Sequence, residues 1–396
     1  MISVAEAGAR VVAAFTPMKS ENVSIGQAAG RVLAEAAIAC LSQPPSPVSA
    51  MDGYAVRSAD AAAAQTSLRV IGSSPAGHPF TGTLGAGEAV RIFTGGVVPE
   101  GADAIVIQED TTAHENGVTL NAPAQRGRHI RVAGLDFKAG DVLVQAGRRL
   151  TARDVALLAA GNLAQVPVRR KPRIAFAATG DELSRPGETL KPGGIVASSG
   201  YALAAQIEKW GGMPIDLGIL PDKVEAIAAI AATDAELIVT LGGASVGDHD
   251  LVQRALGPKG FTLDFWRIAM RPGKPLIFGK LGKTPLLGFP GNPASTFVCS
   301  LLFLRPAIAA LLGTDASLPL MSVRLAGEMA ANDTREDYVR ARLSLRDGEY
   351  WAEPFPRQDS SMQRVLAQAD ALIVRLPHAA AVGPGGRVNA IALAGL

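Results

Sequence analysis

The spacing of hydrophobic and polar residues changes along this chain of 396 residues. Over residues 1–40, apolar side chains recur three and four positions apart, which predicts helix, with a second helical run over 25–33 and an extended exit over 32–39. Short apolar runs separated by Gly, Pro and Asp follow between 68 and 136, a pattern typical of a small β barrel or sandwich. Strand-like and helix-like segments alternate from residue 171, and short strands return after 315.

The alternating region predicts a doubly wound, mostly parallel α/β sheet. We expect its strands at 173–178, 213–220 and 237–241, and its helices at 201–210, 223–232 and 251–256. If the strand order is 2-1-3, the loops 179–183 and 242–250 meet at the topological switch point, where such sheets bind ligands. Glu182, Asp248 and Asp250 would then converge on one crevice, with Asp222 at another strand end.

One glycine-rich loop carries the strongest local signal. It follows the third strand with Gly242, Gly243 and Ser245, and the carboxylates Asp248 and Asp250 precede the next helix. Free backbone N–H groups at a helix N-terminus bind anions, and carboxylates bind hard cations through oxygen. The loop matches neither a P-loop nor a GxGxxG fingerprint. A tight turn with Asp residues as caps is the alternative.

Basic residues accumulate later in the same region. Arg267, Arg271 and Lys274 lie at or after a strand predicted at 264–270. After another strand, the loop 290–295 leads into a strongly apolar helix, expected at 296–312. Carboxylates together with guanidinium and ammonium groups suit a metal ion and a phosphorylated or oxyanion substrate. A surface ion-pair cluster is the alternative.

These patterns predict four domains in an α/β multidomain chain. A proline-rich connector at 42–48 ends the first segment, and a helix at 152–161 is expected to rejoin it. The predicted domains are a discontinuous elongated helical domain (1–43 and 138–170), a small β domain (44–137), the doubly wound domain (171–314) and a C-terminal β domain (315–396).

Composition narrows the class of protein. With 48% hydrophobic and 19% charged residues, the chain can bury a large core, and its net charge of +2 gives no broad basic field for nucleic acid. The two cysteines, Cys40 and Cys299, are far apart, which argues against a disulfide scaffold or a Cys-ligated zinc site. The apolar run 298–312 is interrupted by Arg305 and Pro306, so we expect no membrane span and a cytoplasmic location.

Two further motifs are turn-like when taken alone. Asp52 stands in the Ser-Ala-Met-Asp-Gly-Tyr-Ala stretch 49–55, and Thr94 precedes Gly-Gly at a predicted strand end. The five histidines are scattered, and no HExxH, Ser/His/Asp or nucleophile-elbow pattern is present.

Six motifs in order make the chain resemble the MoeA family, the molybdopterin molybdenumtransferases, which are similar to the C-terminal domain of gephyrin. They are Ser-Ala-Met-Asp-Gly-Tyr-Ala from 49, Thr-Gly-Gly-Val-Val-Pro-Glu-Gly-Ala-Asp from 94, Thr-Gly-Asp-Glu-Leu from 179, Gly-Gly-Ala-Ser-Val-Gly from 242, Arg-Pro-Gly-Lys-Pro from 271, and Phe-Pro-Gly-Asn-Pro-Ala-Ser from 289. The resemblance runs over essentially the whole chain.

The resemblance implies a reaction and an assembly. Adenylylated molybdopterin and molybdate bind, Mg²⁺ assists cleavage of the pyrophosphate bond, AMP leaves, and the pterin dithiolene holds the molybdenum. The subunit would be elongated and would form a homodimer, with each cleft lined by the β domain of one subunit and the last two domains of the other. The molybdopterin adenylyltransferase and downstream cofactor-maturation proteins would be further partners.

The resemblance also assigns residues. Asp52, Thr94, Glu182, Asp222 and Asp250 match catalytic positions, and Glu182, Asp222 and Asp250 would hold the Mg²⁺. The expected substrate-binding residues are Asp136, Gly242, Gly243, Ser245, Arg267, Arg271, Lys274, Pro290, Pro293, Ser295, Arg340 and Ser360. Departures from the family pattern include Arg267 and Arg271 in place of lysines, and Gln358 to Ser361 in place of a more glycine-rich loop.

Two other functions are weighed against molybdenum insertion. Adenylylation of molybdopterin would need the doubly wound domain but neither β domain. A non-catalytic scaffold, as in gephyrin, would not need the carboxylates Asp52, Glu182, Asp222 and Asp250. Tungstate is the alternative metal oxyanion, because it is nearly isosteric with molybdate.

Overall fold

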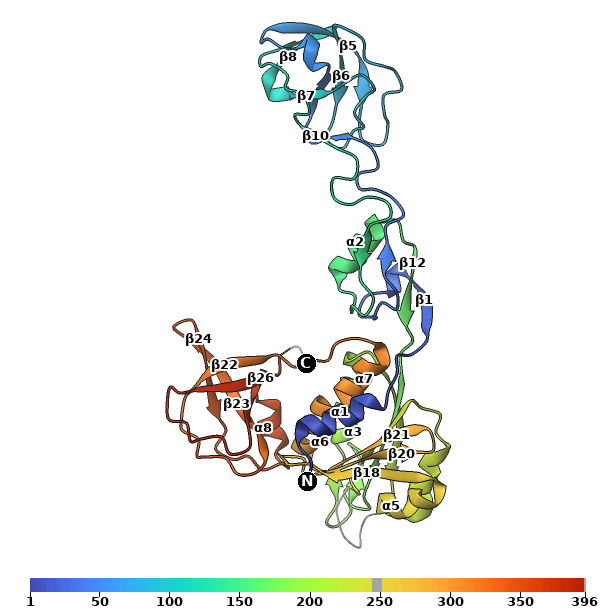
Figure 1. Cartoon of the computed structure of the whole chain (residues 1–396), viewed down its shortest axis with the longest axis vertical. Helices are drawn as coiled ribbons and strands as arrows, with labels where there is room; N and C mark the ends of the chain where they lie inside the picture. The colour runs from blue at the N-terminus through green and yellow to red at the C-terminus, as the bar shows by residue number, and fades with distance from the viewer. Residues whose placement is uncertain (244–250, 395–396) are drawn as a thin grey trace. The chain divides into compact units, whose positions relative to one another are not determined.

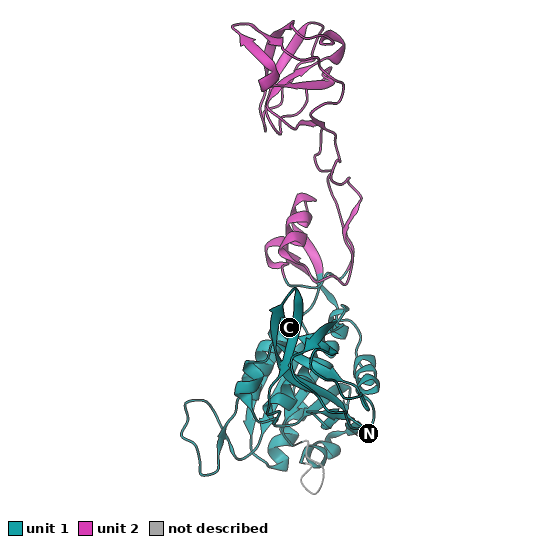
Figure 2. Ribbon diagram, turned by 90° about the vertical axis from the view of Figure 1, so that its left-hand side faces the viewer, with its two compact units in different colours: residues 1–21, 30–34, 168–396 teal, residues 22–29, 35–167 magenta. Residues whose placement is uncertain are grey.

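The computed structural model describes residues 1–243 and 251–394, which form two compact units (Figure 2). Unit 1 comprises Met1–Glu21, Gly30–Ala34 and Val168–Leu396, and unit 2 comprises Asn22–Ala29 and Glu35–Pro167. The division into four domains is finer than this and stays a prediction.

The centre of unit 1 is a six-stranded sheet in the order β16-β13-β17-β21-β20-β18. Its strands are β13 (Arg173–Thr179), β16 (Met213–Leu220), β17 (Leu237–Leu241), β18 (Phe261–Arg267), β20 (Pro275–Leu281) and β21 (Thr284–Phe289). β16, β13, β17 and β21 are parallel, whereas β20 and β18 are antiparallel to their neighbours. The predicted 2-1-3 order of the first three strands is therefore confirmed.

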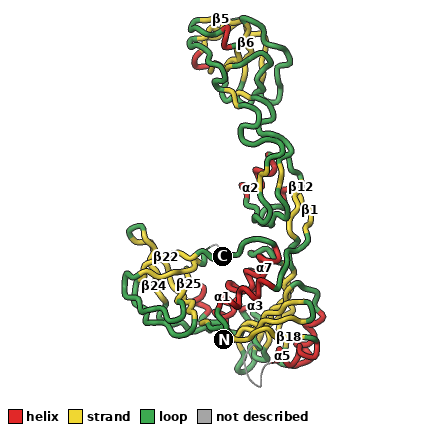
Figure 3. Tube along the Cα trace, in the orientation of Figure 1, coloured by secondary structure: helices red, strands yellow, loops and turns green. Residues whose placement is uncertain are grey.

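Helices cover both faces of this sheet because successive side chains of each strand point to opposite sides. Ile174 and Phe176 of β13 pack in one cluster with α3 (Ser199–Lys209) and α7 (Arg305–Leu312), while Ala175 and Ala177 pack with α4 (Val224–Ala228) and α5 (Leu251–Leu256). Figure 3 shows α1, α3 and α7 grouped beside one another. Such burial on both sides explains why β17 is apolar along its length except for Thr240.

The apolar helix is longer than the sequence predicts. It begins at Pro293 and runs through α6 (Pro293–Cys299), a π-helical turn at Ser300–Leu304, and α7. Pro306 does not end it, since Pro is tolerated in the first turn after the π-helical segment. By length and composition alone its 20 residues could span a membrane, with a mean hydropathy of 1.8 over an 18-residue window, but 72% of that window is buried, as in the core helix of a globular protein.

The helix predicted within residues 1–40 is wrong after its first third, whereas the extended exit predicted at 32–39 contains a strand. Helix α1 (Val4–Ala13) forms, with Ser3 capping Glu6 N–H, and it buries Ala7 and Val11 in the core of unit 1 beside α7. The later part contains β1 (Ser20–Ser24), a 3₁₀ turn at Ile25–Gln27 and β2 (Ala37–Ile38). Gly26, Gly30 and β-branched residues lower helix propensity there, and strand pairing prevails.

A second six-stranded sheet of unit 1 has the order β19-β23-β24-β22-β26-β25. Its strands are β19 (Met270–Arg271), β22 (Leu320–Leu325), β23 (Glu336–Arg346), β24 (Glu349–Pro354), β25 (Ala371–Arg375) and β26 (Arg387–Ala392), and α8 (Gln363–Ala367) lies between β24 and β25 in the chain (Figure 1). β19 lies in the chain between β18 and β20 of the first sheet, but it pairs with β23 of the second sheet. It therefore joins the two sheets directly.

Unit 2 contains the third six-stranded sheet, ordered β7-β4-β6-β5-β9-β8. Its strands are β4 (Gly53–Val56), β5 (Thr66–Ser74), β6 (Glu88–Ile92), β7 (Ala104–Ile107), β8 (Thr111–His114) and β9 (Gly117–Leu120). Short pairs accompany it: β3 (Val48–Ser49) with β10 (Ile130–Arg131), β2 with β11 (Val142–Val144), and β1 with β12 (Gln165–Arg169). Helix α2 (Ala152–Ala160) forms where predicted.

Helix α2 begins with a buried charged network. Burial of Asp154 favours its protonated form, but hydrogen bonds from Thr151 N–H (2.8 Å), Thr151 Oγ1 (2.7 Å) and the Arg148 guanidinium (3.0 Å) outweigh burial and lower the pKa of Asp154 from 3.8 to about 2. The ionised carboxylate is therefore the form that the folded state stabilises.

We expect Asp154→Asn to lower the free energy of unfolding by about 2 kcal/mol near neutral pH. Because the pKa is depressed on folding, this stabilisation is present above pH 3.8 and is lost as the pH falls toward 2. Urea unfolding of wild type and variant, near neutral pH and again near pH 2, measures the difference, with Glu115→Gln, an exposed turn residue, as the control. A difference that persists unchanged at the low pH would show that charge is not its source.

Candidate active site

Three loops meet at the carboxyl ends of the parallel strands in unit 1. Gly242 follows β17 with φ +97°, and a Cβ on it would lie 2.7 Å from the carbonyl oxygen of Thr179 at the end of β13. Gly242 N–H donates to Phe289 O at the end of β21, and Gly291 lies against the Cα of Gly242. Only glycine allows this approach, so the predicted meeting of the first and third loops is confirmed as far as Gly243. Ser245, Asp248 and Asp250 lie outside the described residues.

Acidic residues gather beside these loops. Asp222, just after β16, donates its backbone N–H to Asp181 Oδ1 (3.2 Å), and the Glu182 carboxylate lies over Gly180. Burial raises the pKa of Asp222, and the negative charges of Asp181 and Glu182 raise it further. The predicted proximity of Glu182 and Asp222 is thus observed, and Asp181 joins them.

The uncompensated charge of these carboxylates suits a divalent cation in kind, since oxygen ligands are those that Mg²⁺ prefers. Across residues 1–243 and 251–394, no group of three His, Cys, Asp or Glu side chains is arranged to hold a metal ion. Glu182 and Asp222 would therefore need a further ligand, and Asp250, the third residue of the predicted set, lies outside the described residues.

The loop after β21 is held from two directions. Thr296 Oγ1 donates to Pro290 O (2.7 Å), which fixes the turn that precedes α6. Asn292 Nδ2 donates to Ser360 Oγ (3.0 Å), and Ala294 N–H donates to Ser360 O (2.9 Å). The structure therefore brings the predicted residues of this loop, Pro290, Pro293 and Ser295, together with Ser360 from the second sheet's region.

Arg340, whose predicted role as an oxyanion contact stays a prediction, is buried and hydrogen-bonded within the chain. Its side chain is 1% exposed, and its guanidinium donates to Gln358 Oε1 (3.2 Å) and to Asp359 O (3.0 Å). Gln358 in turn donates to Arg340 O (2.9 Å). These bonds hold the loop that carries Ser360, so the geometry favours positioning over direct contact.

The predicted basic residues lie at the same end of the first sheet. Strand register places Arg267 opposite Pro275 and Ile277 opposite Gly288, so Arg267 and Lys274 stand at the edge where β21 ends. Arg267 stacks on Trp266 with its guanidinium 3.7 Å from the ring centroid, and Lys274 is exposed. Arg271 instead forms a two-bond ion pair with Asp337 (2.9 and 2.6 Å), which ties β19 to β23.

Unit 2 brings together the other two predicted catalytic residues. Asp52 Oδ1 accepts hydrogen bonds from Thr94 N–H (2.7 Å) and Thr94 Oγ1 (2.8 Å). These bonds, the backbone one first, lower the pKa of Asp52, and Arg91 adds to the effect. Asp136 is exposed elsewhere in unit 2, where its N–H donates to Gln43 O.

Family models match most of the chain in order. The MoeA N-terminal region (domain I and II) matches residues 2–161, a probable molybdopterin binding domain matches 175–310, and the MoeA C-terminal region (domain IV) matches 322–393. A protein named molybdopterin molybdenumtransferase from Nostoc sp. is 38% identical over 90% of this chain and 84% of its own length. The chain belongs to the MoeA family.

Further relatives agree with this assignment. A molybdopterin molybdenumtransferase from Bacillus subtilis is 35% identical over 94% of this chain and 90% of its own. The crystal structure of a molybdopterin biosynthesis MoeA protein from Pyrococcus horikoshii has a TM-score of 0.86 and 30% identity, covering 99% of each chain. The predicted MoeA-family enzyme of molybdenum cofactor biosynthesis is therefore confirmed, as is a multidomain α/β fold with mixed sheets.

Two residues of this MoeA-family site were not predicted. Asp181 stands inside the Thr-Gly-Asp-Glu motif, and its place beside a glycine at a strand end was the available signal. Thr179 is 5% exposed, and its Oγ1 makes no hydrogen bond within the described chain, although it faces Gly242 and Gly243. Neither could be separated from an ordinary turn residue before the strand order was known.

We expect Thr94→Val to raise the pKa of Asp52 toward its ordinary value, because it removes the hydroxyl donor. The Thr94 N–H remains, so the pKa should stay below 3.8. Carboxyl-carbon NMR titration of Asp52 measures this, with Thr94→Ser as the control that keeps a hydroxyl. Equal pKa values in all three proteins would mean that the hydroxyl bond does not act on Asp52 in solution.

Proposed function

We propose that this MoeA-family chain inserts molybdenum from molybdate into adenylylated molybdopterin, with Mg²⁺-dependent release of AMP. The observation that supports it best is the meeting of the carboxylates Asp181, Glu182 and Asp222 with glycine loops at one end of a parallel sheet. Basic residues stand along the same edge. This arrangement offers oxygen ligands for a cation and positive charge for an oxyanion.

Glu182 and Asp222 would hold Mg²⁺, with Asp250 as the third carboxylate ligand. A bound Mg²⁺ neutralises phosphate charge and polarises the bond that breaks. The Thr179 hydroxyl, which makes no hydrogen bond to the residues that the structure describes, and the backbone around Gly242 and Gly243 would face the phosphates at the strand ends. The site's sulfur chemistry belongs to the substrate, which explains why Cys299 can be a buried core residue.

Molybdate would be held by cations beside β18 and β20, which lie on the other side of β21 from the carboxylates. Lys274 and Arg267 carry the charge that a doubly negative oxyanion requires. Ser360 and the loop 290–295 would contribute uncharged donors, and Arg340 would keep Ser360 in place through the backbone of Asp359. Arg271 can join them only by loosening its pair with Asp337.

The assembly that we propose is a cytoplasmic homodimer in which Asp52 and Thr94 of one subunit serve the cleft of the other. Asp136 would line the same cleft. The enzyme that adenylylates molybdopterin would supply the substrate, and proteins of later cofactor maturation would accept the product. Neither nucleic acid nor membrane takes part in this reaction.

The first test follows AMP and metal-bound pterin with purified protein, adenylylated molybdopterin, Mg²⁺ and molybdate. We expect molybdate-dependent AMP release in wild type and a loss of at least about 100-fold in Glu182→Gln and Asp222→Asn, because each removes a charged ligand. Glu208→Gln changes an exposed carboxylate of α3 and should behave as wild type. Tight pterin binding without AMP release would leave a carrier or scaffold, and AMP formation from ATP without molybdate would indicate the adenylylating step instead.

A second test asks whether two subunits build each cleft. Asp52→Asn and Glu182→Gln subunits, each inactive alone, are mixed and allowed to exchange. If the clefts are shared, one cleft of every hybrid dimer carries both native carboxylates, so about a quarter of wild-type activity should return on random mixing. No recovery, with hybrid dimers demonstrated by mass spectrometry, would show that both residues act within one subunit.

A further inference from the structure

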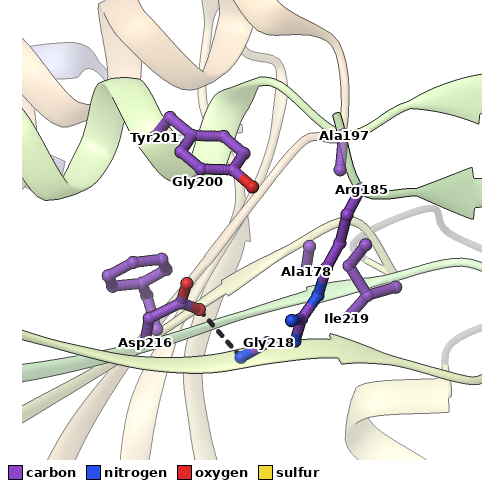
Figure 4. Close-up of a pocket in the computed structure, with 9 residues that line it drawn as sticks. Ala178, Arg185, Ala197, Gly200, Tyr201, Asp216, Gly218 and Ile219 are labelled. Carbon is purple, nitrogen blue, oxygen red and sulfur yellow. Dashed lines mark hydrogen bonds between the residues drawn. The ribbon is translucent and has the colours of Figure 1, made fainter. Parts of the chain in front are cut away.

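A hollow lies beside the acidic loops of unit 1, at the edge strand β16. It encloses about 370 Å³ of space, a volume that includes the part open to solvent. Its floor is apolar, from Phe176, Ala178 and Ile219, and three functional side chains line it: Arg185, Tyr201 and Asp216 (Figure 4).

These three side chains point into the same space from different elements. Tyr201 comes from the first turn of α3 and is 58% exposed, Arg185 follows the short strand β14 (Leu183–Ser184), and Asp216 comes from β16. Within the described chain, Arg185 and Asp216 form no salt bridge with each other or with another residue. A cation and an anion that face one hollow without neutralising each other are both available to a ligand.

The backbone aims Asp216 into the hollow. Its Oδ1 accepts Gly218 N–H (2.8 Å), and the pairing of β16 with β13 shifts register at this point, as in a β-bulge. Gly218 has φ +82°, and a Cβ on it would lie 3.3 Å from Arg185 Nη2. Glycine at this position therefore keeps the hollow open between the guanidinium and the strand.

The hollow adjoins the predicted phosphate and metal site. Ala178 pairs with Ile219, and the next pair, Thr179 with Leu220, leads directly into the loops that carry Glu182 and Asp222. Three residues of extended chain, from Ile219 to Asp222, span at most about 10 Å. A molecule whose phosphates lie at the carboxylates can therefore place an attached ring in the hollow.

We propose that this hollow binds a flat, 2-amino-4-oxo-substituted pyrimidine ring system, the ring edge of a pterin, an inference that rests on the proposed function. An ionised carboxylate only accepts hydrogen bonds, and it pairs best with two donors side by side. The ring N–H and the neighbouring 2-amino group of a pterin supply such a pair. Adenine presents one amino group next to a ring nitrogen that is itself an acceptor, which would face a carboxylate oxygen.

The other two side chains complete the recognition. The Tyr201 ring offers a face for stacking, and stacking by itself does not distinguish bases. The planar guanidinium of Arg185 supplies donors for the 4-oxo group or stacks on the ring. Specificity for the pterin edge over adenine therefore depends on Asp216, and affinity depends on all three side chains.

The test uses the full chain with pterin itself as the fluorescent probe, without Mg²⁺ or molybdate. We expect saturable pterin binding that Asp216→Asn weakens at least about tenfold, because the amide replaces one acceptor by a donor while its Oδ1 can still accept from Gly218 N–H. Tyr201→Ser should also weaken it, and Tyr201→Phe should retain most of it. Asp347→Asn, which changes an exposed turn residue, is the matched control.

Binding of AMP to the same proteins, measured by calorimetry, decides between the two ring ends of the proposed substrate. Asp216→Asn should leave AMP affinity unchanged. Loss of AMP binding with pterin binding intact would overturn the pterin assignment, and so would equal pterin binding by wild type and Asp216→Asn. If Asp216→Asn still releases AMP at the wild-type KM, the subsite is wrong and the proposed function stands. If wild type binds pterin through Asp216 but never releases AMP, the subsite is right and the proposed function is wrong.

Discussion

The close approach of Gly242 to Thr179 governs how the ends of β13 and β17 meet, and the rest of the site depends on it. A side chain at 242 would collide with the Thr179 backbone, so the loop after β17 can fold across the end of β13 only because its first residue is glycine. The same glycine bonds to Phe289 at the end of β21. Three separate strand ends are thereby drawn into one surface, and their loops carry the acidic and uncharged polar groups of the candidate site.

A second constraint links this surface to the C-terminal sheet. β19 pairs with β23, Arg271 binds Asp337 beside that pairing, and Ser360 bonds to the loop 290–295. The buried guanidinium of Arg340 donates hydrogen bonds to the Gln358 side chain and to the Asp359 carbonyl. These bonds fix the segment that precedes Ser360. A buried guanidinium is costly unless its donors are bonded, so these contacts define a single arrangement of that loop.

Charge is distributed unevenly along the sheet end. Carboxylates collect over β13 and β16, where the raised pKa of Asp222 reflects burial and like-charge repulsion. Cations stand over β18 and β20, on the far side of β21. The phosphates of a substrate could bind at the carboxylates through a cation, and an oxyanion co-substrate could bind at the cations on the other side. The hollow beside β16 extends the same surface past the carboxylates, with one anion and one cation, Asp216 and Arg185, that form no salt bridge within the described chain.

Local sequence pattern was enough to predict the strand and helix alternation of the α/β region, the β-rich character of the other two regions, and the family, because period and motif order are local properties of the chain. Local pattern failed over residues 14–33, where long-range strand pairing overrode helical spacing, and it could not separate Asp181, Thr179 or Asp216 from ordinary turn and strand residues. Only the tertiary structure decided that Arg340 is buried beneath a loop and that Arg271 is engaged by Asp337, since partners far apart in sequence leave no periodic signal. The strand order brought Glu182 and Asp222 together, and that order is set by packing on both faces of the sheet.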